Sequence, residues 1–136
     1  MATAKMEGFF PYPRERVWAA VTDLSDWRWR SDLKGLEVTG PDTFVEYAAD
    51  GTATRFAVRR REEPGLWAFE MENGNMAGCW TGRFADAPGG CTAAFTEEVQ
   101  AKRVWMRPFV GWYLRSQQRR YWADLRRRLE ALAGEK

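Results

Sequence analysis

The sequence contains no histidine among its 136 residues. Histidine is the usual general base near neutral pH, the usual partner of a catalytic nucleophile and the commonest protein ligand of zinc. Its absence excludes hydrolases, lyases and dehydratases that depend on this side chain. The sequence also has no cluster of metal ligands and no glycine-rich phosphate loop, so we expect neither a metal nor an organic cofactor.

Cysteine is scarce. The two cysteines, Cys79 and Cys91, flank a turn sequence at residues 86–90 that predicts a hairpin loop. In such a hairpin the two sulfur atoms lie far apart along the paired strands, so no disulfide is expected. We interpret both as free, packed thiols; a reactive or ligand-contacting thiol is the alternative.

Long apolar runs are missing as well. No N-terminal segment combines a basic region, an apolar stretch and a small-residue cleavage site, and no apolar run approaches the length needed to span a bilayer. We therefore expect a cytoplasmic protein without membrane insertion.

What the sequence has in abundance is tryptophan, with eight residues, in a chain that is 45% apolar and 29% charged. The length and composition are typical of one globular domain, which we assign to residues 1–136. Because each large ring buries a large area, the tryptophans must fill a core, line a cavity or form an adhesive surface.

The N-terminal part of the chain predicts one strand and two short helices. Residues 4–10 are rich in strand formers. A proline suited to a first helical turn opens a helix over residues 13–22, in which apolar residues fall on one face. A second, shorter helix is predicted over residues 23–29, with Asp23 or Ser25 as its N-cap.

Alternation of apolar and polar residues then predicts six strands separated by turns. They span residues 34–39, 44–49, 52–62, 67–73, 76–85 and 91–101. Asp50-Gly51 is a strong hairpin signal between the second and third of these strands. Short turns between consecutive strands predict an antiparallel meander.

The last element is a helix from residue 108 to about residue 133, roughly 39 Å long at 1.5 Å per residue. Its predicted buried stripe consists of residues at helical spacing: Phe109, Tyr113, Leu114, Gln117, Tyr121, Leu125, Leu129 and Leu132. The order of elements gives an α+β fold, in which a curved antiparallel sheet of about seven strands wraps around a long C-terminal helix.

This order resembles the START-like helix-grip superfamily, also called SRPBCC, which includes the polyketide cyclase/dehydrase family and the plant pollen-allergen proteins. The resemblance covers nearly the whole chain and rests on residues 10–18, 22–23, 27–29, 89–90, 96–99 and 117–118. Residues 29–33 and 71–76 are similar to an uncharacterised bacterial branch of the family. One fold hosts many functions, so the resemblance implies the fold more than the chemistry.

A sheet curled around a helix leaves a cavity beneath the helix unless side chains fill it. Strand alternation and helix position predict the ligand-binding residues Phe56, Trp67, Phe69, Met71, Asn73, Trp80, Phe84, Phe95, Glu97, Phe109, Tyr113 and Gln117. The small residues Gly78, Gly82 and Ala93 favour an open cavity; the alternative is that the aromatic side chains complete the core.

Glu97 is the single candidate for a catalytic residue. If it points into an apolar cavity, its pKa is raised, and it could act as acid or base or orient a ligand hydroxyl. Alternatively, Glu97 pairs with an arginine such as Arg83 or faces solvent.

Residues 102–128 carry nine basic residues and one acidic residue. Such a segment could attract an acidic partner, nucleic acid or an anionic membrane. Because no nucleic-acid-binding motif accompanies it, we interpret the arginines as a solvated helix face and expect no nucleic-acid partner.

Three functions remain open. The first is binding of a small hydrophobic molecule, such as a lipid, a polyketide or an aromatic metabolite. The second, which the resemblance permits, is a polyketide cyclase or aromatase, in which the cavity positions a reactive chain and Glu97 assists. The third is a protein-interaction module similar to the chaperone-activating members of the fold. A monomer or a homodimer is expected, and the absence of recognisable catalytic residues favours a binder over an enzyme.

Overall fold

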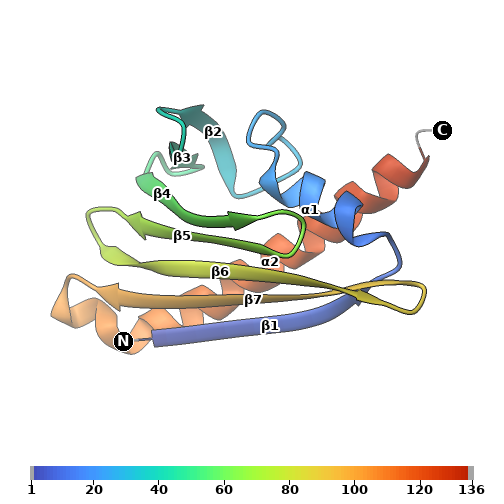
Figure 1. The fold of residues 1–136 in the computed structure, drawn as a ribbon. Helices are drawn as coiled ribbons and strands as arrows, with labels where there is room; N and C mark the ends of the chain where they lie inside the picture. Colours follow the sequence, from blue (N-terminus) through green and yellow to red (C-terminus); the bar gives the residue numbers. More distant parts are fainter. Residues whose placement is uncertain (1, 135–136) are drawn as a thin grey trace.

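The computed structural model describes residues 2–134 and contains seven strands, two α-helices and one turn of 3-10 helix (Figure 1). The strands are β1 (Ala2–Phe10), β2 (Leu33–Val38), β3 (Thr43–Ala48), β4 (Ala53–Glu62), β5 (Leu66–Glu72), β6 (Met76–Ala87) and β7 (Gly90–Ala101). The helical elements are α1 (Arg14–Thr22), η1 (Val104–Met106) and α2 (Arg107–Gly134).

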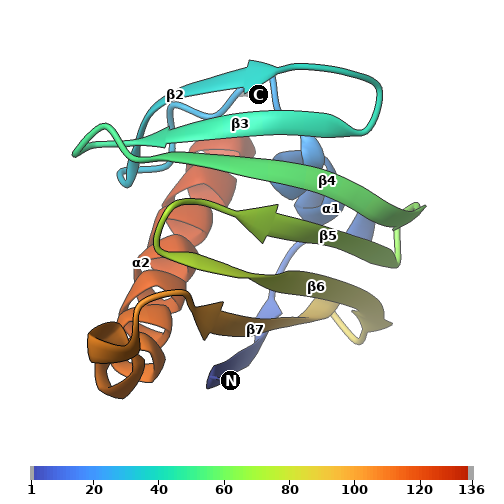
Figure 2. The same cartoon turned by 90° about the vertical axis from the view of Figure 1, so that its left-hand side faces the viewer.

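All seven strands form one antiparallel sheet in the order β1-β7-β6-β5-β4-β3-β2. The first strand therefore pairs with the last, with Ala2 opposite Val99 and Phe10 opposite Cys91. The sheet curves, and α2 runs across its concave face (Figure 2). The predicted α+β helix-grip fold is confirmed.

Helix α1 forms as expected, with Val17, Trp18 and Val21 buried. The second short helix, predicted over residues 23–29, is wrong: the chain makes successive turns there. The reason is local hydrogen bonding, because the Asp23 carboxylate accepts bonds from the backbone N–H and hydroxyl of Ser25, at 3.0 and 2.6 Å. Such bonds stabilise a turn in competition with a helix.

Helix α2 has the predicted length, but its buried face differs from the predicted stripe. Leu114, Leu125 and Leu129 are buried as expected, whereas Phe109 and Tyr113 are exposed. The helix instead buries residues spaced three or four apart: Val110, Leu114, Gln118, Trp122, Leu125 and Leu129. Gln118 can occupy a core position because its amide is hydrogen-bonded. Its Nε2 donates to the Ala4 carbonyl oxygen at 3.1 Å.

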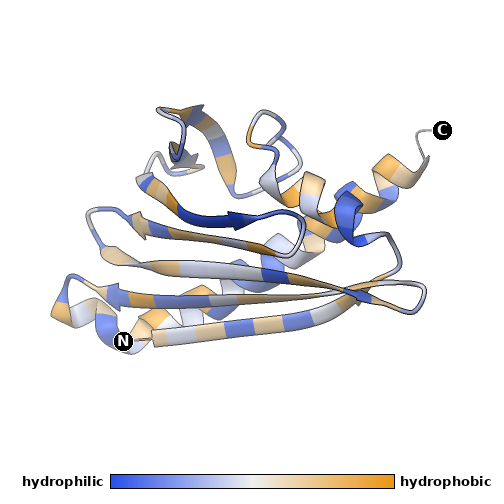
Figure 3. Cartoon of the chain, viewed as in Figure 1, coloured by the Kyte–Doolittle hydropathy of each residue, from blue (hydrophilic) through white to orange (hydrophobic). Residues whose placement is uncertain are grey.

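The core lies between α2 and the concave face of the sheet. Phe10 of β1 stacks on Trp122 of α2 with ring centroids 4.9 Å apart, and Phe95 of β7 lies at 4.9 Å from the same indole. Apolar and polar residues alternate along β1, as the bands in Figure 3 show, so one face of the strand meets α2. These contacts hold the helix at a fixed distance from the sheet and leave room farther along its length.

Candidate functional site

A cavity of about 390 Å³ lies between the sheet, α2 and the segment that precedes β2. Ten of the twelve predicted ligand-binding residues line it: Phe56, Trp67, Phe69, Met71, Asn73, Trp80, Phe95, Glu97, Tyr113 and Gln117. Phe84 and Phe109 do not. Phe84 is buried against Trp18 of α1 at 5.5 Å, and Phe109 is 61% exposed on the first turn of α2.

One wall of the cavity is a continuous set of aromatic rings. Phe44 and Phe56 stack at 4.7 Å, Phe69 and Trp80 stack at 4.9 Å, and Trp80 meets Phe95 at 4.9 Å. Rings in contact with several others are held rigidly, so the wall presents a preformed apolar surface. These rings belong to the buried core and also line the cavity.

Gly82 affects the shape of this wall because the Trp80 ring occupies the space where a side chain would lie. A Cβ atom at Gly82 would lie 2.5 Å from the Trp80 ring, so the missing side chain makes room for the indole. The expectation that Gly82 leaves space for a ligand is wrong, because Trp80 occupies that space. The glycine instead allows the ring to lie flat in the wall.

Glu97 is one of the ionisable groups that line the cavity. Burial raises the pKa of its carboxyl from 4.5 to about 7; the Gln118 amide partly offsets this, and the Glu46 carboxylate adds to it. Gln118 Nε2 lies 3.5 Å from Glu97 Oε1. The alternative in which Glu97 faces solvent or pairs with Arg83 does not describe its position, since it lines the cavity wall between β7 and α2.

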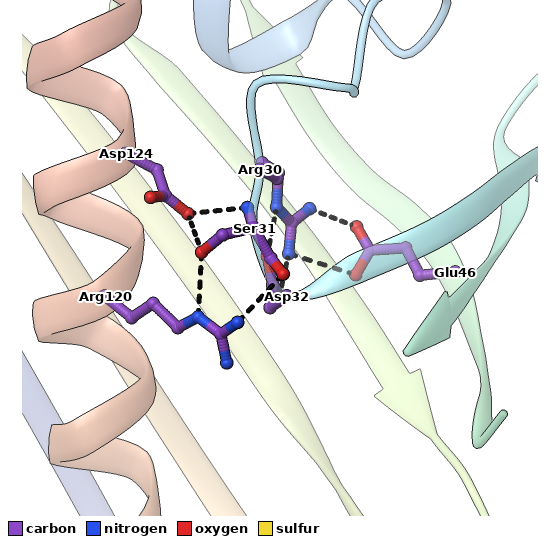
Figure 4. A network of polar contacts seen from close by, with 6 residues as sticks. All are labelled: Arg30, Ser31, Asp32, Glu46, Arg120 and Asp124. Carbon is purple, nitrogen blue, oxygen red and sulfur yellow. Dashed lines mark hydrogen bonds and ion pairs between the residues drawn. The ribbon is translucent and has the colours of Figure 1, made fainter. Parts of the chain in front are cut away.

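A partly buried ion triad of Arg30, Asp32 and Glu46 lies at one side of the cavity (Figure 4). The Arg30 guanidinium donates to Glu46 at 2.6 and 3.3 Å and to Asp32 at 2.9 and 3.3 Å. Burial alone would lower the pKa of Arg30, but the carboxylates of Glu46 and Asp32 outweigh it and hold that pKa above its ordinary value. Arg30 also lies over the Tyr121 ring at 5.1 Å.

The segment that precedes β2 is attached to α2 through Asp124, which is 2% exposed. Its carboxylate accepts hydrogen bonds from the backbone N–H and hydroxyl of Ser31, both at 2.8 Å (Figure 4). Arg120 completes the contact by donating to the Ser31 hydroxyl and carbonyl oxygens at 2.8 Å. The segment is thus held against the helix and covers the cavity at this end.

Asn73 lies at the edge of the cavity, where it stabilises the turn between β5 and β6. Its Oδ1 accepts bonds from the backbone N–H groups of Asn75 and Met76 at 2.8 and 3.0 Å, and its Nδ2 donates to the Thr54 hydroxyl at 3.1 Å. Most of its hydrogen-bonding capacity is therefore used within the protein.

Sequence reasoning missed several residues of the site, above all Arg30, Glu46 and Tyr121. The sequence did hold one signal for Glu46, since it alternates in phase with the buried Phe44 on β3. Arg30 follows an irregular segment that has no periodicity, so no pattern could place it opposite Glu46.

The cysteines lie outside this cavity lining. Both are free; Cys91 is buried as expected, whereas Cys79 is exposed on the outer face of β6. Burial raises the pKa of both thiols, and neighbouring carboxylates add to this, so neither has the lowered pKa of a reactive cysteine. Among residues 2–134, no helix is both long enough and apolar enough to cross a bilayer.

Comparison with solved structures supports the helix-grip fold. A START superfamily protein from Mycobacterium smegmatis matches with a TM-score of 0.88 and 13% identity over 97% of this chain and 99% of that one. A protein from Thermus thermophilus matches with a TM-score of 0.84 and 16% identity over the same shares. An uncharacterised protein from Rhizobium leguminosarum matches with a TM-score of 0.76 and 22% identity over 96% of this chain and 95% of that one.

The fold and the cavity beneath α2 define the chain as a START-like, helix-grip protein. Residues 1–130 match the family model described as polyketide cyclase / dehydrase and lipid transport, and the chain belongs to that family. The search of curated proteins found no match.

Proposed function

We propose that the protein binds a small hydrophobic molecule, such as a lipid, a polyketide or an aromatic metabolite, in the cavity between the sheet and α2. The observation that carries the proposal is the aromatic-walled cavity of about 390 Å³, a volume within the range of roughly 300–1,000 Å³ typical of small-molecule sites. Membership of a family described by polyketide chemistry and lipid transport supports it.

Unpaired polar atoms in the cavity wall indicate what the ligand needs besides an apolar body. Gln118 Oε1 and Trp67 Nε1 are buried and have no hydrogen-bond partner within residues 2–134. Leaving a buried polar atom unpaired costs about 1–3 kcal/mol. A ligand whose hydroxyl or carbonyl group reaches these atoms after a small side-chain rotation would satisfy them while its flat apolar portion contacts the rings.

The test is to fill the cavity without removing its walls. Ala48 lines the cavity from β3, so an Ala48→Phe substitution adds a ring to the ligand space. We expect saturable quenching of tryptophan fluorescence by at least one member of a panel of fatty acids, sterols, flavonoids and polyketides, and a loss of roughly ten-fold or more in affinity in Ala48→Phe.

The matched control is Ala53→Phe, which adds the same ring at an exposed position of β4. It should bind as the wild type does. Native mass spectra of the purified protein provide a second readout, since a ligand that co-purifies with the wild type should be absent from Ala48→Phe. A wild-type protein that is free of ligand and ignores the whole panel would contradict the proposal.

A second candidate function, a cyclase-like enzyme, is favoured by Glu97. A carboxyl with a pKa of about 7 is poised to donate or accept a proton near neutral pH, and it faces a cavity that could fold a reactive chain. The proton would pass between Glu97 Oε and a ligand carbonyl or adjacent carbon. This chemistry needs no histidine, metal or cofactor.

Glu97→Gln separates the two functions, because the amide keeps the size of the side chain but cannot exchange a proton. For an enzyme, conversion of a linear poly-β-carbonyl compound, followed by mass spectrometry, should fall by about 10²-fold or more while binding persists. For a binder, the wild type should return the compound unchanged.

A further inference from the structure

The largest exposed apolar side chains gather at one end of the molecule. Five of the seven large hydrophobic residues that are exposed lie within ten consecutive positions, and we call them the aromatic patch: Val104, Trp105, Phe109, Trp112 and Tyr113. Trp105 is 68% exposed and Trp112 is 64% exposed. Single exposed hydrophobic residues are ordinary, but a contiguous group of this kind marks a surface that meets an apolar partner.

The patch is the outward side of η1 and of the first turns of α2, at the end of β7 (Figure 1). Phe109, Trp112 and Tyr113 recur at spacings of three and four on the helix, while Val110 and Leu114 bury the opposite face against β1 and β7. Burial of the inner face leaves Phe109 and Trp112 exposed to solvent, and Tyr113, which also lines the cavity, partly exposed.

Positive charge surrounds the patch. Residues 99–123 contain six basic residues and no acidic residue. Within residues 2–134, the ion pairs involve none of Arg103, Arg107, Arg115 and Arg119. These guanidinium groups are free to meet anionic groups outside the protein.

We propose that this end of the molecule docks on an anionic lipid surface. Tryptophan and tyrosine side chains favour the boundary between headgroups and acyl chains, and nearby arginines pair with lipid phosphates. A second copy of the chain fits less well, because a symmetric contact through the patch would bring like-charged Arg103 and Arg107 groups together. Docking of this kind requires no spanning helix.

The patch and the cavity meet at Tyr113, which belongs to the first and lines the second. Docking would therefore bring the rim of the cavity to the lipid surface, where a hydrophobic ligand could enter without crossing water. The docking proposal itself does not rest on ligand binding, since it is carried by the exposed residues and their charge.

The test is sedimentation of the protein with vesicles of phosphatidylcholine and phosphatidylglycerol in equal parts, compared with vesicles of phosphatidylcholine alone. We expect binding to the anionic vesicles that weakens as sodium chloride is added. Trp105→Ser with Trp112→Ser should lower the partition coefficient about ten-fold or more. Arg103→Gln with Arg107→Gln should lower it roughly five-fold for each arginine.

Matched controls place the same changes elsewhere on the surface. Val38→Ser removes an apolar side chain that is 59% exposed on β2, and Arg16→Gln with Arg61→Gln removes two exposed charges. Both controls should bind vesicles as the wild type does, and so should Ala48→Phe, whose cavity is filled. Failure of docking and failure of ligand binding are thereby distinguished.

Two results would overturn the proposal. One is a folded wild-type protein that ignores the anionic vesicles at low salt. The other is a dimer in analytical ultracentrifugation that dissociates in the Trp105→Ser, Trp112→Ser variant, which would assign the patch to a second copy of the chain.

Discussion

Glu97 links the chemistry of the cavity to the stability of the fold. Its carboxyl is removed from water by folding, so the folded state binds the proton more tightly than the unfolded chain does. The stability that this proton contributes is fully present below about pH 4.5 and is lost as the pH rises toward about 7. Above that pH, Glu97 is ionised in the folded state, and burial of the charged carboxylate lowers the free energy of unfolding.

We therefore expect the free energy of unfolding of the wild type to fall by about 1–3 kcal/mol more between acidic and mildly alkaline pH than that of Glu97→Gln. Urea unfolding followed by circular dichroism at several pH values measures the difference. Glu98→Gln, which changes the exposed neighbour on the outer face of β7, is the control and should follow the wild type. Parallel curves for the wild type and Glu97→Gln would show that Glu97 titrates normally.

Single residues of the cavity could be predicted from the sequence only where a strand supplied the pattern. Trp80, Phe95 and Glu97 were placed correctly because side chains on a strand alternate between two faces. Arg30 could not be placed, because it precedes β2 in a segment of turns and meets Glu46 through tertiary contact alone. The alternation of apolar and polar residues therefore gave no indication of the polar side of the site.

At the scale of elements, the irregular segment of residues 23–32 is attached to α2 by one buried carboxylate, Asp124, together with two arginines, Arg120 and Arg128. Asp124 accepts two hydrogen bonds from Ser31, and Arg127 pairs with its other oxygen. Removing the carboxylate would leave the Ser31 N–H without its partner and weaken the attachment of the segment, which Arg120 would still hold at Ser31 and Arg128 at Asp26.

Asp124→Ala should lower the free energy of unfolding by about 2–4 kcal/mol, since it breaks a buried, charge-assisted contact. Arg127→Ala is the control, because the Arg127 side chain is 66% exposed and exposed pairs contribute about 0–1 kcal/mol. Urea unfolding gives both values, and limited proteolysis should cut residues 23–32 faster in Asp124→Ala. Equal stability of the two variants would show that the segment does not depend on Asp124.

The two helices show what sequence patterns can and cannot provide at this scale. The bounds of α2 were predicted to within a residue because no strong helix breaker interrupts them. The predicted buried face of α2 was wrong at Phe109 and Tyr113, because these aromatic residues were assigned to the core and Gln118 was not. Gln118 is buried because Ala4, distant in sequence, offers a carbonyl acceptor, and helical periodicity carries no information on such a partner.

At the scale of the whole molecule, one side of the sheet has long, extensively paired strands and the other side has short strands with less pairing. Strands β6 and β7 have twelve residues each and pair along their full length, and β7 also pairs with β1 on its other side. By contrast, β2 has six residues and forms one edge of the sheet. The segment before β2 contacts α2 through Ser31, which is bonded to Asp124 and Arg120, and through Arg30, which lies over the Tyr121 ring.

Amide hydrogen exchange should therefore be slowest in β6 and β7 and fastest in β2, β3 and residues 23–32, because local opening costs least where few buried contacts are lost. A ligand in the cavity should slow exchange mainly in β3 and in residues 113–121 of α2, which line the cavity, and leave the β6–β7 turn unchanged. Exchange followed by mass spectrometry with and without ligand measures both effects, and Ala48→Phe supplies the control in which added ligand should protect nothing. Uniform protection across the sheet would contradict the division, and protection confined to η1 and the first turn of α2 would place the ligand on the aromatic patch instead of in the cavity.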